Sequence, residues 1–341
     1  MINKSKIFTF AVLVYNQEST VLETLESIKY QIKKFGEGYN FKIFITDDGS
    51  KDLTFLLVNN WIKKNHKLFF YSKLLANKKN MGTVYNYNVL MNCIEDEPFK
   101  IIAGDDLIGP ESIFENLSND VNVIDTFPFY KLIDEKICFS KLYLYDYFYK
   151  MKTYKNKKNL RWMRKGDFLH TPSTFYLKKL YDFGECTKWN NEFFLFEDDP
   201  TFYGMLKANN NISIIFHPNA LILYRYTSFS TSTIPNKRFM EDWIKLQEIY
   251  YKESKGLEKI YFYCRKKSGS VHKFDLYKII DRMRQAFRIL YIIFMCHNEF
   301  NNFYQDYSIK INDVQIYYND IKDKALSFGE NIKESFKYAG D

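Results

Sequence analysis

The sequence predicts an α/β fold, with a mostly parallel sheet flanked by helices and a helical extension at the C-terminal end. Apolar runs of strand length alternate with segments of helical apolar spacing over roughly the first hundred residues. Such alternation indicates right-handed crossovers between parallel strands. Two of the apolar runs end in a pair of aspartates, and from about Phe239 onward the pattern is helical, with few glycines and no proline.

The first strand is expected at residues 7–15 and the first helix at residues 20–31. The run 7–15 is apolar apart from Thr9, and Val21, Leu22, Leu25 and Ile28 recur at helical spacing in the next segment. Further strands are expected at residues 41–46, 68–71 and 101–103, and further helices at residues 53–64 and 82–93. Unbroken apolar runs of this length are typical of fully buried strands.

The alternation weakens beyond Pro110. A helix, an aromatic segment at residues 127–149 and a basic block follow, with strands expected at residues 174–177, 212–216 and 220–226. Pro235 interrupts a Ser/Thr-rich stretch, which places a domain boundary near residues 232–237. We therefore expect one domain over residues 1–235, with two halves that meet near residue 110, and a helical region over residues 236–341.

Length and composition limit the class of protein. The 341 residues, 46% of them hydrophobic, suffice for a large globular domain with an appendage. The five cysteines are scattered and form no CxxC pair, which argues against a disulfide framework and fits a reducing cytoplasm. No apolar run approaches the roughly 20 residues that cross a bilayer, and no signal peptide is recognisable. The expected location is cytoplasmic.

The net charge of +8 is unevenly distributed. Residues 150–165 hold eight basic and no acidic side chains, and residues 259–288 hold nine basic against two acidic ones. Each block fits either a solvated loop or helix face, or a surface for anionic lipid, phosphate or nucleic acid. Arg282, Arg284 and Arg288 border an apolar stretch that ends near Phe294. This segment fits a helix in a membrane interface, with its guanidiniums at the headgroups, or a helix buried against the domain or a partner subunit.

Two acidic doublets follow buried strands, and this is the most informative feature of the chain. Asp47 and Asp48 close one apolar run, and Asp105 and Asp106 close another. Adjacent carboxylates repel and lose hydration near a core, so stability alone does not explain them. The carboxyl ends of strands in open α/β sheets form the ligand-binding edge, so a nucleotide, a sugar and a divalent metal are the natural candidates.

Four motifs in order resemble the family 2 glycosyltransferases of the GT-A fold, which is Rossmann-like. They are a strand that ends in Tyr15-Asn16, a strand that ends in Asp47-Asp48-Gly49-Ser50, the segment Asn80-Met81-Gly82 before a helix, and Asp105-Asp106 after a strand. The resemblance covers roughly residues 7–230. The chain lacks the GxGxxG of a dinucleotide-binding fold and the GKS/T of a phosphate loop.

The resemblance assigns the nucleotide-sugar donor to the half at about residues 1–110 and the acceptor to about residues 111–235 of the catalytic domain. Its donor-binding positions are Leu13, Tyr15, Asp47, Asp48, Asn80, Asn86 and Asp105. By resemblance, Tyr15 would stack near the nucleobase, and Asp48 would accept a hydrogen bond from the edge of the base. From the residues alone, the Asp-Asp-Gly-Ser segment also fits a plain turn with Asx capping.

Asp105 and Asp106 occupy the place of the metal-binding carboxylates of the family. Departure of a nucleoside diphosphate builds negative charge that a divalent cation offsets, and oxygen ligands suit Mn²⁺ or Mg²⁺. The pair departs from the usual Asp-x-Asp spelling. Asp105 is interpreted as a ribose or metal contact and Asp106 as the main metal ligand. A helix N-cap before Pro110 is the alternative.

Residues Glu197 and Asp198 are the candidate catalytic pair. They follow the aromatic run 193–196, whose apolar wall would raise a carboxyl pKa. By resemblance, Asp198 is the base that takes the proton of the acceptor hydroxyl, and Glu197 orients it or the acceptor. An acidic N-terminus for a helix over residues 200–207 is the alternative, and both can hold together.

Three further side chains have weaker assignments. Arg225 would contact phosphate or form a salt bridge at a strand edge. His170 would reach the acceptor pocket, and His217 before Pro218 is interpreted as structural.

The expected function is metal-dependent, inverting transfer of a sugar from a nucleotide sugar, expected to be a UDP-sugar, to a hydroxyl of a glycan or lipid-linked acceptor. Bacterial surface polysaccharide synthesis is the expected setting, with peripheral contact to the inner face of the membrane and no nucleic acid partner. A nucleotidyltransferase is an alternative, although its usual Gly-rich basic loop is absent. A non-catalytic module that holds membrane or nucleic acid through the basic blocks is another.

Overall fold

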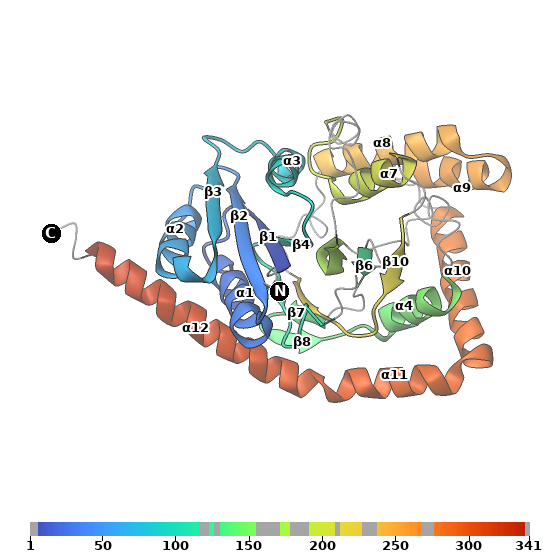
Figure 1. Cartoon of the computed structure of the whole chain (residues 1–341). Coiled ribbons are helices and arrows are strands. Elements are labelled where there is room, and N and C mark those ends of the chain that lie inside the picture. Colours follow the sequence, from blue (N-terminus) through green and yellow to red (C-terminus); the bar gives the residue numbers. More distant parts are fainter. Residues whose placement is uncertain are drawn as a thin grey trace, which may run out of the picture.

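The computed structural model describes residues 6–115, 123–125, 130–154, 171–177, 191–208, 212–226, 237–267 and 276–337. Their architecture is mixed α/β, with helices on both faces of a mostly parallel sheet and a run of helices at the C-terminal end (Figure 1). The fold class predicted from the sequence is confirmed.

A seven-stranded sheet forms the centre, in the order β10-β6-β9-β4-β1-β2-β3. Its strands are β1 (Lys6–Val14), β2 (Tyr39–Asp47), β3 (Tyr71–Ala76), β4 (Phe99–Ala103), β6 (Val123–Asp125), β9 (Thr174–Tyr176) and β10 (Ile214–Phe216). β9 runs antiparallel to its neighbours β4 and β6, and the other pairs are parallel. A smaller sheet contains β5 (Leu107–Ile108), β11 (Ile222–Arg225), β7 (Tyr130–Ile133) and β8 (Lys136–Cys138), in this order.

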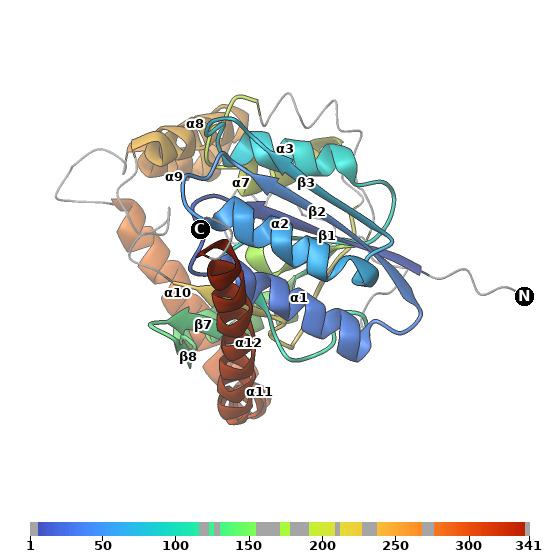
Figure 2. The same cartoon turned by 90° about the vertical axis from the view of Figure 1, so that its left-hand side faces the viewer.

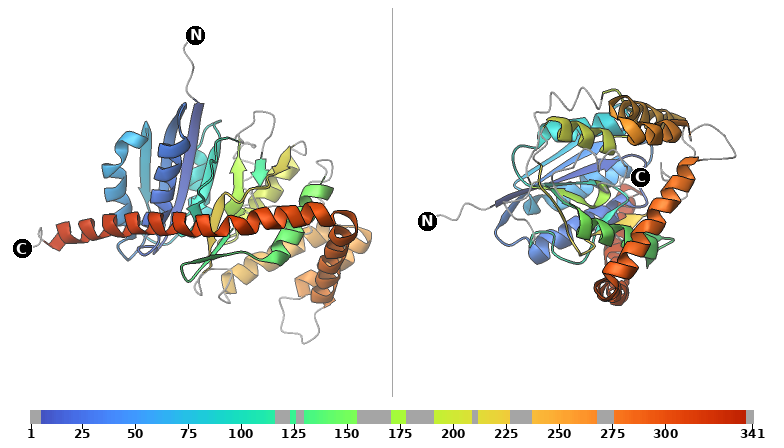
Figure 3. Two further views of the ribbon diagram at one scale, coloured as in Figure 1. Left: turned by 90° about the horizontal axis from the view of Figure 1, so that it is seen from below. Right: turned by 90° about the vertical axis from the view of Figure 1, so that its right-hand side faces the viewer.

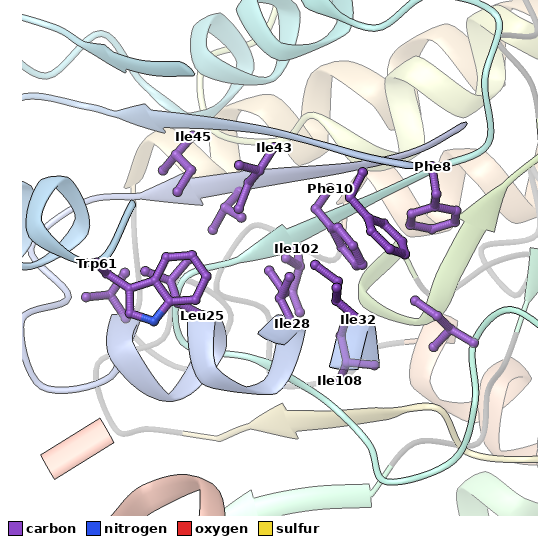
Figure 4. Close-up of a cluster of buried hydrophobic side chains, with 14 of the residues drawn as sticks. Phe8, Phe10, Leu25, Ile28, Ile32, Ile43, Ile45, Trp61, Ile102 and Ile108 are labelled. Atoms are coloured by element: carbon purple, nitrogen blue, oxygen red, sulfur yellow. The ribbon is translucent and has the colours of Figure 1, made fainter. Parts of the chain in front are cut away.

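Helices bury both faces of the large sheet, which explains why its strands read as unbroken apolar runs. Phe8 and Phe10 of β1 lie in one cluster with residues of α1 (Val21–Phe35) and α2 (Thr54–Lys64), as Figure 4 shows. Ala11, on the opposite face, lies in a second cluster with residues of α3 (Thr83–Cys93) and α7 (Asp198–Ala208). Side chains that alternate along each strand thus divide between two cores.

The C-terminal helices in the described ranges pack back onto the sheet domain. They are α8 (Lys237–Glu253), α9 (Gly256–Lys267), α10 (Leu276–Met295), α11 (His297–Ile309) and α12 (Ile311–Lys337). α8 lies beside α7, and α10 packs against α4 (Lys141–Thr153). The long helix α12 runs across α1 and α2 (Figures 2 and 3). Its Phe328 lies in the first core cluster, and its Tyr317 hydroxyl donates to Ile108 O of β5 (2.7 Å).

The strand predicted at residues 68–71 is wrong in position. Leu68 ends a short 3-10 helix, η1 (His66–Leu68), and β3 begins only at Tyr71. β3 is the edge strand, and its residues are exposed or half-buried, so no continuous apolar run marks it. Residues 110–115 contain bends and no helix, and the rest of the segment in which a helix was expected after Pro110 is not among the described residues. Residues 116–122 and most of the predicted boundary at 232–237 lie outside the described ranges.

Candidate active site

Three neighbouring strands end at the same edge of the large sheet. Val14 of β1 pairs with Asp47 of β2, and Leu13 of β1 pairs with Ala103 of β4. The two acidic pairs therefore lie at one edge, on either side of the turn that carries Tyr15. This is the edge at which open α/β sheets bind ligands.

Side-chain hydrogen bonds tie the loop after β1 to the loop after β2. The pairs are Asn16 N to Ser50 Oγ (2.9 Å), Lys51 N to Asn16 Oδ1 (2.8 Å), Glu18 N to Asp52 Oδ2 (3.1 Å), Leu53 N to Glu18 Oε2 (2.8 Å) and Gln17 N to Thr54 Oγ1 (2.7 Å). They satisfy backbone amides that the strand ladders leave free. The edge is thus fixed by the protein itself, and Tyr15 remains 42% exposed on it.

The carboxylates of Asp47 and Asp48 are both buried and occupied by protein donors. Asp47 Oδ1 accepts the amide and hydroxyl of Ser50, which closes the turn. Asp48 accepts hydrogen bonds from Met81 N (2.6 Å) and Gly82 N (2.9 Å). Its carboxylate therefore anchors the loop at residues 77–82 to the end of β2.

Asn86 and Asn80 lie differently with respect to that loop. Asn86 is buried in α3, and its Nδ2 donates to Gly82 O (2.9 Å). The side chain of Asn77 donates both to Asn86 Oδ1 (2.9 Å) and to Asp48 Oδ1 (3.0 Å). Asn80 is exposed at the tip. Of the two predicted donor-binding asparagines, Asn86 holds the loop in shape and Asn80 faces solvent.

Asp105 and Asp106 have different surroundings. Asp106 is 2% exposed, and its Oδ1 accepts a hydrogen bond from Arg225 N of β11 (2.9 Å). Burial and the charge of Asp105 raise the Asp106 pKa well above its usual range. Asp105 is half-buried at the sheet edge, and burial raises its pKa against the opposing charge of Arg225. Asp105 is the more accessible carboxylate of the pair.

Arg225 connects the acidic pair to α1. Its Nε donates to the carbonyl of Asp105 (2.8 Å), and its guanidinium forms an ion pair with Glu23 of α1. Both partners are largely buried, so the pair is shielded from solvent. Of the two alternatives for Arg225, the structure therefore contains the salt bridge.

A buried lysine links β4 to the segment next to Asp198. Lys100 lies inside β4, and its ammonium donates to the carbonyls of Pro172 (2.6 Å) and Thr174 (3.0 Å). These carbonyls belong to η3 (Thr171–Ser173) and β9. The side chain of Thr171 in turn hydrogen-bonds the carboxylate of Asp198. The strand that ends in the Asp105 pair thus also supports the environment of Asp198.

Glu197, Asp198 and Asp199 form a dense acidic group at the N-terminal end of α7. Asp199 N donates to Asp198 Oδ1 (2.8 Å), a contact within the first turn of the helix. Burial raises all three pKa values, Glu197 to about 8 and Asp199 to about 7, and the charge of Asp198 adds to both of these shifts. Such shifts are common at functional sites. Phe193 and Phe196 of the preceding aromatic run are buried in the same apolar cluster as Phe202 of α7.

Of the two histidines considered in the sequence, His217 is the one that the structure describes. His217 is half-buried, and its Nδ1 accepts a hydrogen bond from Asn219 N (3.2 Å), a local structural contact. Burial lowers its pKa. His170 and most of the block at residues 150–165 lie outside the described residues.

Two of the three predicted arginines of helix α10 contact neighbouring helices. Arg288 forms an ion pair with Asp146 of α4, and Arg284 Nη1 donates to the Tyr261 hydroxyl (2.9 Å). Only Arg282 of the three predicted arginines is exposed. The exposed apolar side chains of this helix are Ile279, Met283, Phe287, Leu290, Ile293, Phe294 and Met295. No helix in the described part of the chain is both long and apolar enough to cross a membrane.

Two polar residues near the site were not predicted from the sequence. Lys100 carried a usable signal, because a lysine inside an apolar strand needs buried acceptors. Asp242 of α8 accepts hydrogen bonds from three backbone amides just before Glu197. No sequence signal indicated this role, because an aspartate in a helix is usually solvated.

Comparison with known proteins assigns the family. The model of glycosyl transferase family 2 matches residues 9–227, which include the sheet edge, Asp198 and Arg225. The chain belongs to glycosyltransferase family 2. The strand-end doublets that resembled this family thus belong to a member of it.

Individual relatives are distant. An uncharacterized glycosyltransferase of Haemophilus influenzae is 27% identical over 130 residues, which cover 37% of this chain and 38% of that protein. S. aureus TarS 1–349 in complex with UDP-GlcNAc has a TM-score of 0.52 at 16% identity, over 97% of this chain and 92% of that one. The complex of TarS 1–349 with UDP has a TM-score of 0.50 at 14% identity, over 97% and 91%. These structures share the fold of this glycosyltransferase.

The residues at the edge fit a divalent cation shared with a substrate. In the described part of the chain, no three His, Cys, Asp or Glu side chains form a group that could hold a metal by themselves. Mg²⁺ sites commonly use only one or two carboxylates together with substrate phosphates. Asp105 offers one accessible carboxylate, so the donor set suits a cation that arrives with a diphosphate.

Proposed function

We propose that this glycosyltransferase moves a sugar from a UDP-sugar to a hydroxyl of a glycan or lipid-linked acceptor, with inversion and with a divalent metal. One observation carries the proposal: β4 ends at Ala103, just before Asp105 at the donor edge, and through Lys100 it supports the segment whose Thr171 hydrogen-bonds Asp198. One strand thereby connects the proposed donor edge with the surroundings of the proposed base. Sites on rigid elements keep the precise geometry that group transfer requires.

For the donor, we assign the nucleobase to Tyr15 and the loop that Asp48 holds. The exposed ring of Tyr15 at the end of β1 suits stacking on a base. Leu13, Asp47, Asn80 and Asn86 complete this donor surface, with Asn86 and Asp47 acting through the shape of their loops. Binding of UDP-GlcNAc by TarS, which shares the fold, supports a UDP-sugar.

For the metal, we assign Asp105 as the ligand and Asp106 as its buried support, because Asp106 is occupied by Arg225 N. This assignment revises the sequence expectation that placed Asp106 first. When bound as Mn²⁺ or Mg²⁺, the cation supplies positive charge that offsets the charge of the departing diphosphate. Arg225, fixed on Glu23 and on the Asp105 carbonyl, keeps the acidic turn in place.

For the chemical step, Asp198 accepts the proton of the acceptor hydroxyl. The hydroxyl oxygen attacks the anomeric carbon, the bond from that carbon to the diphosphate oxygen breaks, and the electron pair leaves with the nucleoside diphosphate. A single displacement inverts the anomeric configuration. Glu197, with its pKa raised to about 8, is mostly protonated at neutral pH and orients Asp198 or the acceptor as a hydrogen-bond donor.

We further propose that the chain divides into a catalytic domain and a helical region. Residues 1–235 form the catalytic domain, with the donor half at about 1–110 and the acceptor half at about 111–235, and residues 236–341 form the helical region. The exposed apolar side chains of α10, together with the exposed Arg282 on the same helix, support peripheral contact of this region with an anionic membrane surface. Contact with a membrane would bring the enzyme to a lipid-linked acceptor in surface polysaccharide synthesis.

The substitution Asp198→Asn tests the proposed function. It removes the base and keeps the size of the side chain, so we expect transfer to fall by about 10²- to 10⁴-fold, the range of general base catalysis. UDP affinity, measured by calorimetry, should stay within about twofold, because the contacts to the metal and the nucleobase remain. Asp320→Asn, on the exposed surface of α12, serves as the control. An equal loss of donor affinity in Asp198→Asn would show that Asp198 has another role.

A further inference from the structure

Helix α8 lies beyond the part of the chain that matches the family. It nevertheless forms hydrogen bonds with the segment that precedes Glu197 and Asp198. Asp242 is 8% exposed, and its Oδ2 accepts hydrogen bonds from three consecutive amides, Phe194 N (2.9 Å), Leu195 N (2.8 Å) and Phe196 N (3.2 Å). Charge-assisted bonds of this kind are roughly twice as strong as neutral ones. One carboxylate oxygen thus fixes three residues directly before the catalytic pair.

The same face of α8 makes further contacts with this segment. Arg238 lies over the ring of Phe194 (4.5 Å), Phe239 packs on Phe196 (5.2 Å), and Lys245 donates to Glu192 O (2.9 Å). Arg238, Asp242 and Lys245 recur at helical spacing of four and three residues, so they share one side of the helix. Asp242 is therefore the centre of an interface and not an isolated contact.

The segment at residues 194–196 also contacts the donor side of the site, at the loop of residues 77–82. Val84 N donates to Phe194 O (3.3 Å), and a Cβ at Gly82 would lie 2.8 Å from the same oxygen. Gly82 N is itself held by Asp48 at the sheet edge (2.9 Å). A continuous set of contacts thus runs from Asp48 through the loop at 77–82 and the segment at 194–196 to Asp242.

We propose that Asp242 is a positioning residue for the transfer reaction: it holds the segment 194–196 between α8 and the donor loop and so sets the place of Asp198 relative to the donor. This inference rests on the proposed role of Asp198 as the base. It gives the helical region, outside the family match, a direct part in the active site. A displacement of about 1 Å at such a site can reduce a rate by about 100-fold.

The test compares Asp242→Ala and Asp242→Asn with Glu241→Gln. Glu241 is the neighbouring residue on α8, exposed and paired only loosely with Lys237 (3.9 Å), so it is a matched control. Hydrogen–deuterium exchange, followed by mass spectrometry on peptides that cover residues 192–197, reports on the three amides. We expect faster exchange in Asp242→Ala, a smaller increase in Asp242→Asn, which keeps one neutral acceptor, and no change in Glu241→Gln.

Kinetics give the second readout. We expect kcat to fall by about 100-fold in Asp242→Ala and about tenfold in Asp242→Asn, with KM for the donor within about twofold of wild type. Unchanged exchange over residues 192–197 in both variants would overturn the proposal, as would a rise in donor KM as large as the fall in kcat. The exchange measurement needs no turnover. Absence of sugar transfer by the wild-type enzyme would therefore count against the proposed function, while exchange would still decide whether Asp242 holds the segment.

Discussion

At the scale of residues, the two acidic doublets are built differently: Asp47 and Asp48 are both occupied by protein donors, whereas Asp105 and Asp106 divide into two tasks. Asp106 and Asp48 accept hydrogen bonds from backbone amides, of Arg225 in one case and of Met81 and Gly82 in the other. Asp105 keeps an accessible carboxylate at the edge. The sequence predicted the doublets and their common edge, but it could not predict this division, because the partners come from residues that are distant along the chain.

Gly82 lies where the loop at residues 77–82 meets the segment 194–196. Its φ of +90° disfavours any side chain, and a Cβ would lie 2.8 Å from the Phe194 carbonyl oxygen. We expect Gly82→Ala to reduce the free energy of unfolding by about 2–4 kcal/mol, from backbone strain and overpacking together. Urea denaturation followed by fluorescence provides the measurement.

Gly38→Ala separates the two causes. Gly38 has a φ of +81°, and no atom lies within 4 Å of the position that a Cβ would take. This variant therefore introduces backbone strain without overpacking, at a cost of about 1 kcal/mol. Equal losses in the two variants would mean that the contact between Gly82 and Phe194 is not tight in solution.

At the scale of elements, the sequence predicted the parts of the fold that are buried on both faces. β1, β2 and β4 read as unbroken apolar runs because helices cover the sheet on both sides. The edge strand β3 was misplaced, since exposed and half-buried residues leave no such run. The role of α8 at the site escaped prediction, because Asp242 becomes informative only when the fold brings it to residues 194–196.

Helix α10 provides the prediction at this scale. Phe287 and Phe294 are 61% and 79% exposed on this helix. We expect Phe287→Ser with Phe294→Ser to reduce binding to vesicles that contain anionic lipid by about tenfold or more, because about 1.5–3 kcal/mol per side chain is lost from the interface. Vesicle flotation measures the bound fraction.

The control for this prediction is Leu326→Ser, another exposed apolar side chain, on α12. Sedimentation velocity without lipid tests the competing arrangement, in which a second copy of the chain covers α10. Two results together would contradict membrane contact and favour self-association: the double variant binds vesicles as well as wild type does, and wild type forms a dimer that the double variant does not form.

At the scale of the whole molecule, the buried acidic group at α7 links stability to pH. The Glu197 pKa rises from 4.5 to about 8 on folding. Between these two pH values the folded protein keeps a proton on Glu197, whereas the unfolded chain has released it. Its contribution to stability is complete below about pH 4.5 and is lost as the pH rises through about 8. We expect the melting temperature to fall across this window.

Glu197→Gln should flatten that dependence, because glutamine carries no titratable proton. Differential scanning calorimetry at several pH values gives the slopes, with Glu330→Gln on the exposed face of α12 as the control. Parallel slopes for Glu197→Gln and wild type would mean that Glu197 is ionised in the folded protein at neutral pH. Asp199, with its pKa raised to about 7, contributes a shift of the same sign and leaves a residual slope.

The central claim is that one edge of the sheet binds a nucleoside diphosphate together with a cation held by Asp105. Calorimetric titration of UDP with and without Mn²⁺, on wild type and on Asp105→Asn, tests it most directly. We predict that Mn²⁺ raises the UDP affinity of wild type by about 5- to 150-fold, the usual range of coupling between ligands, and that Asp105→Asn loses most of this gain. UDP binding that is the same with and without Mn²⁺, or a full gain in Asp105→Asn, would contradict the account.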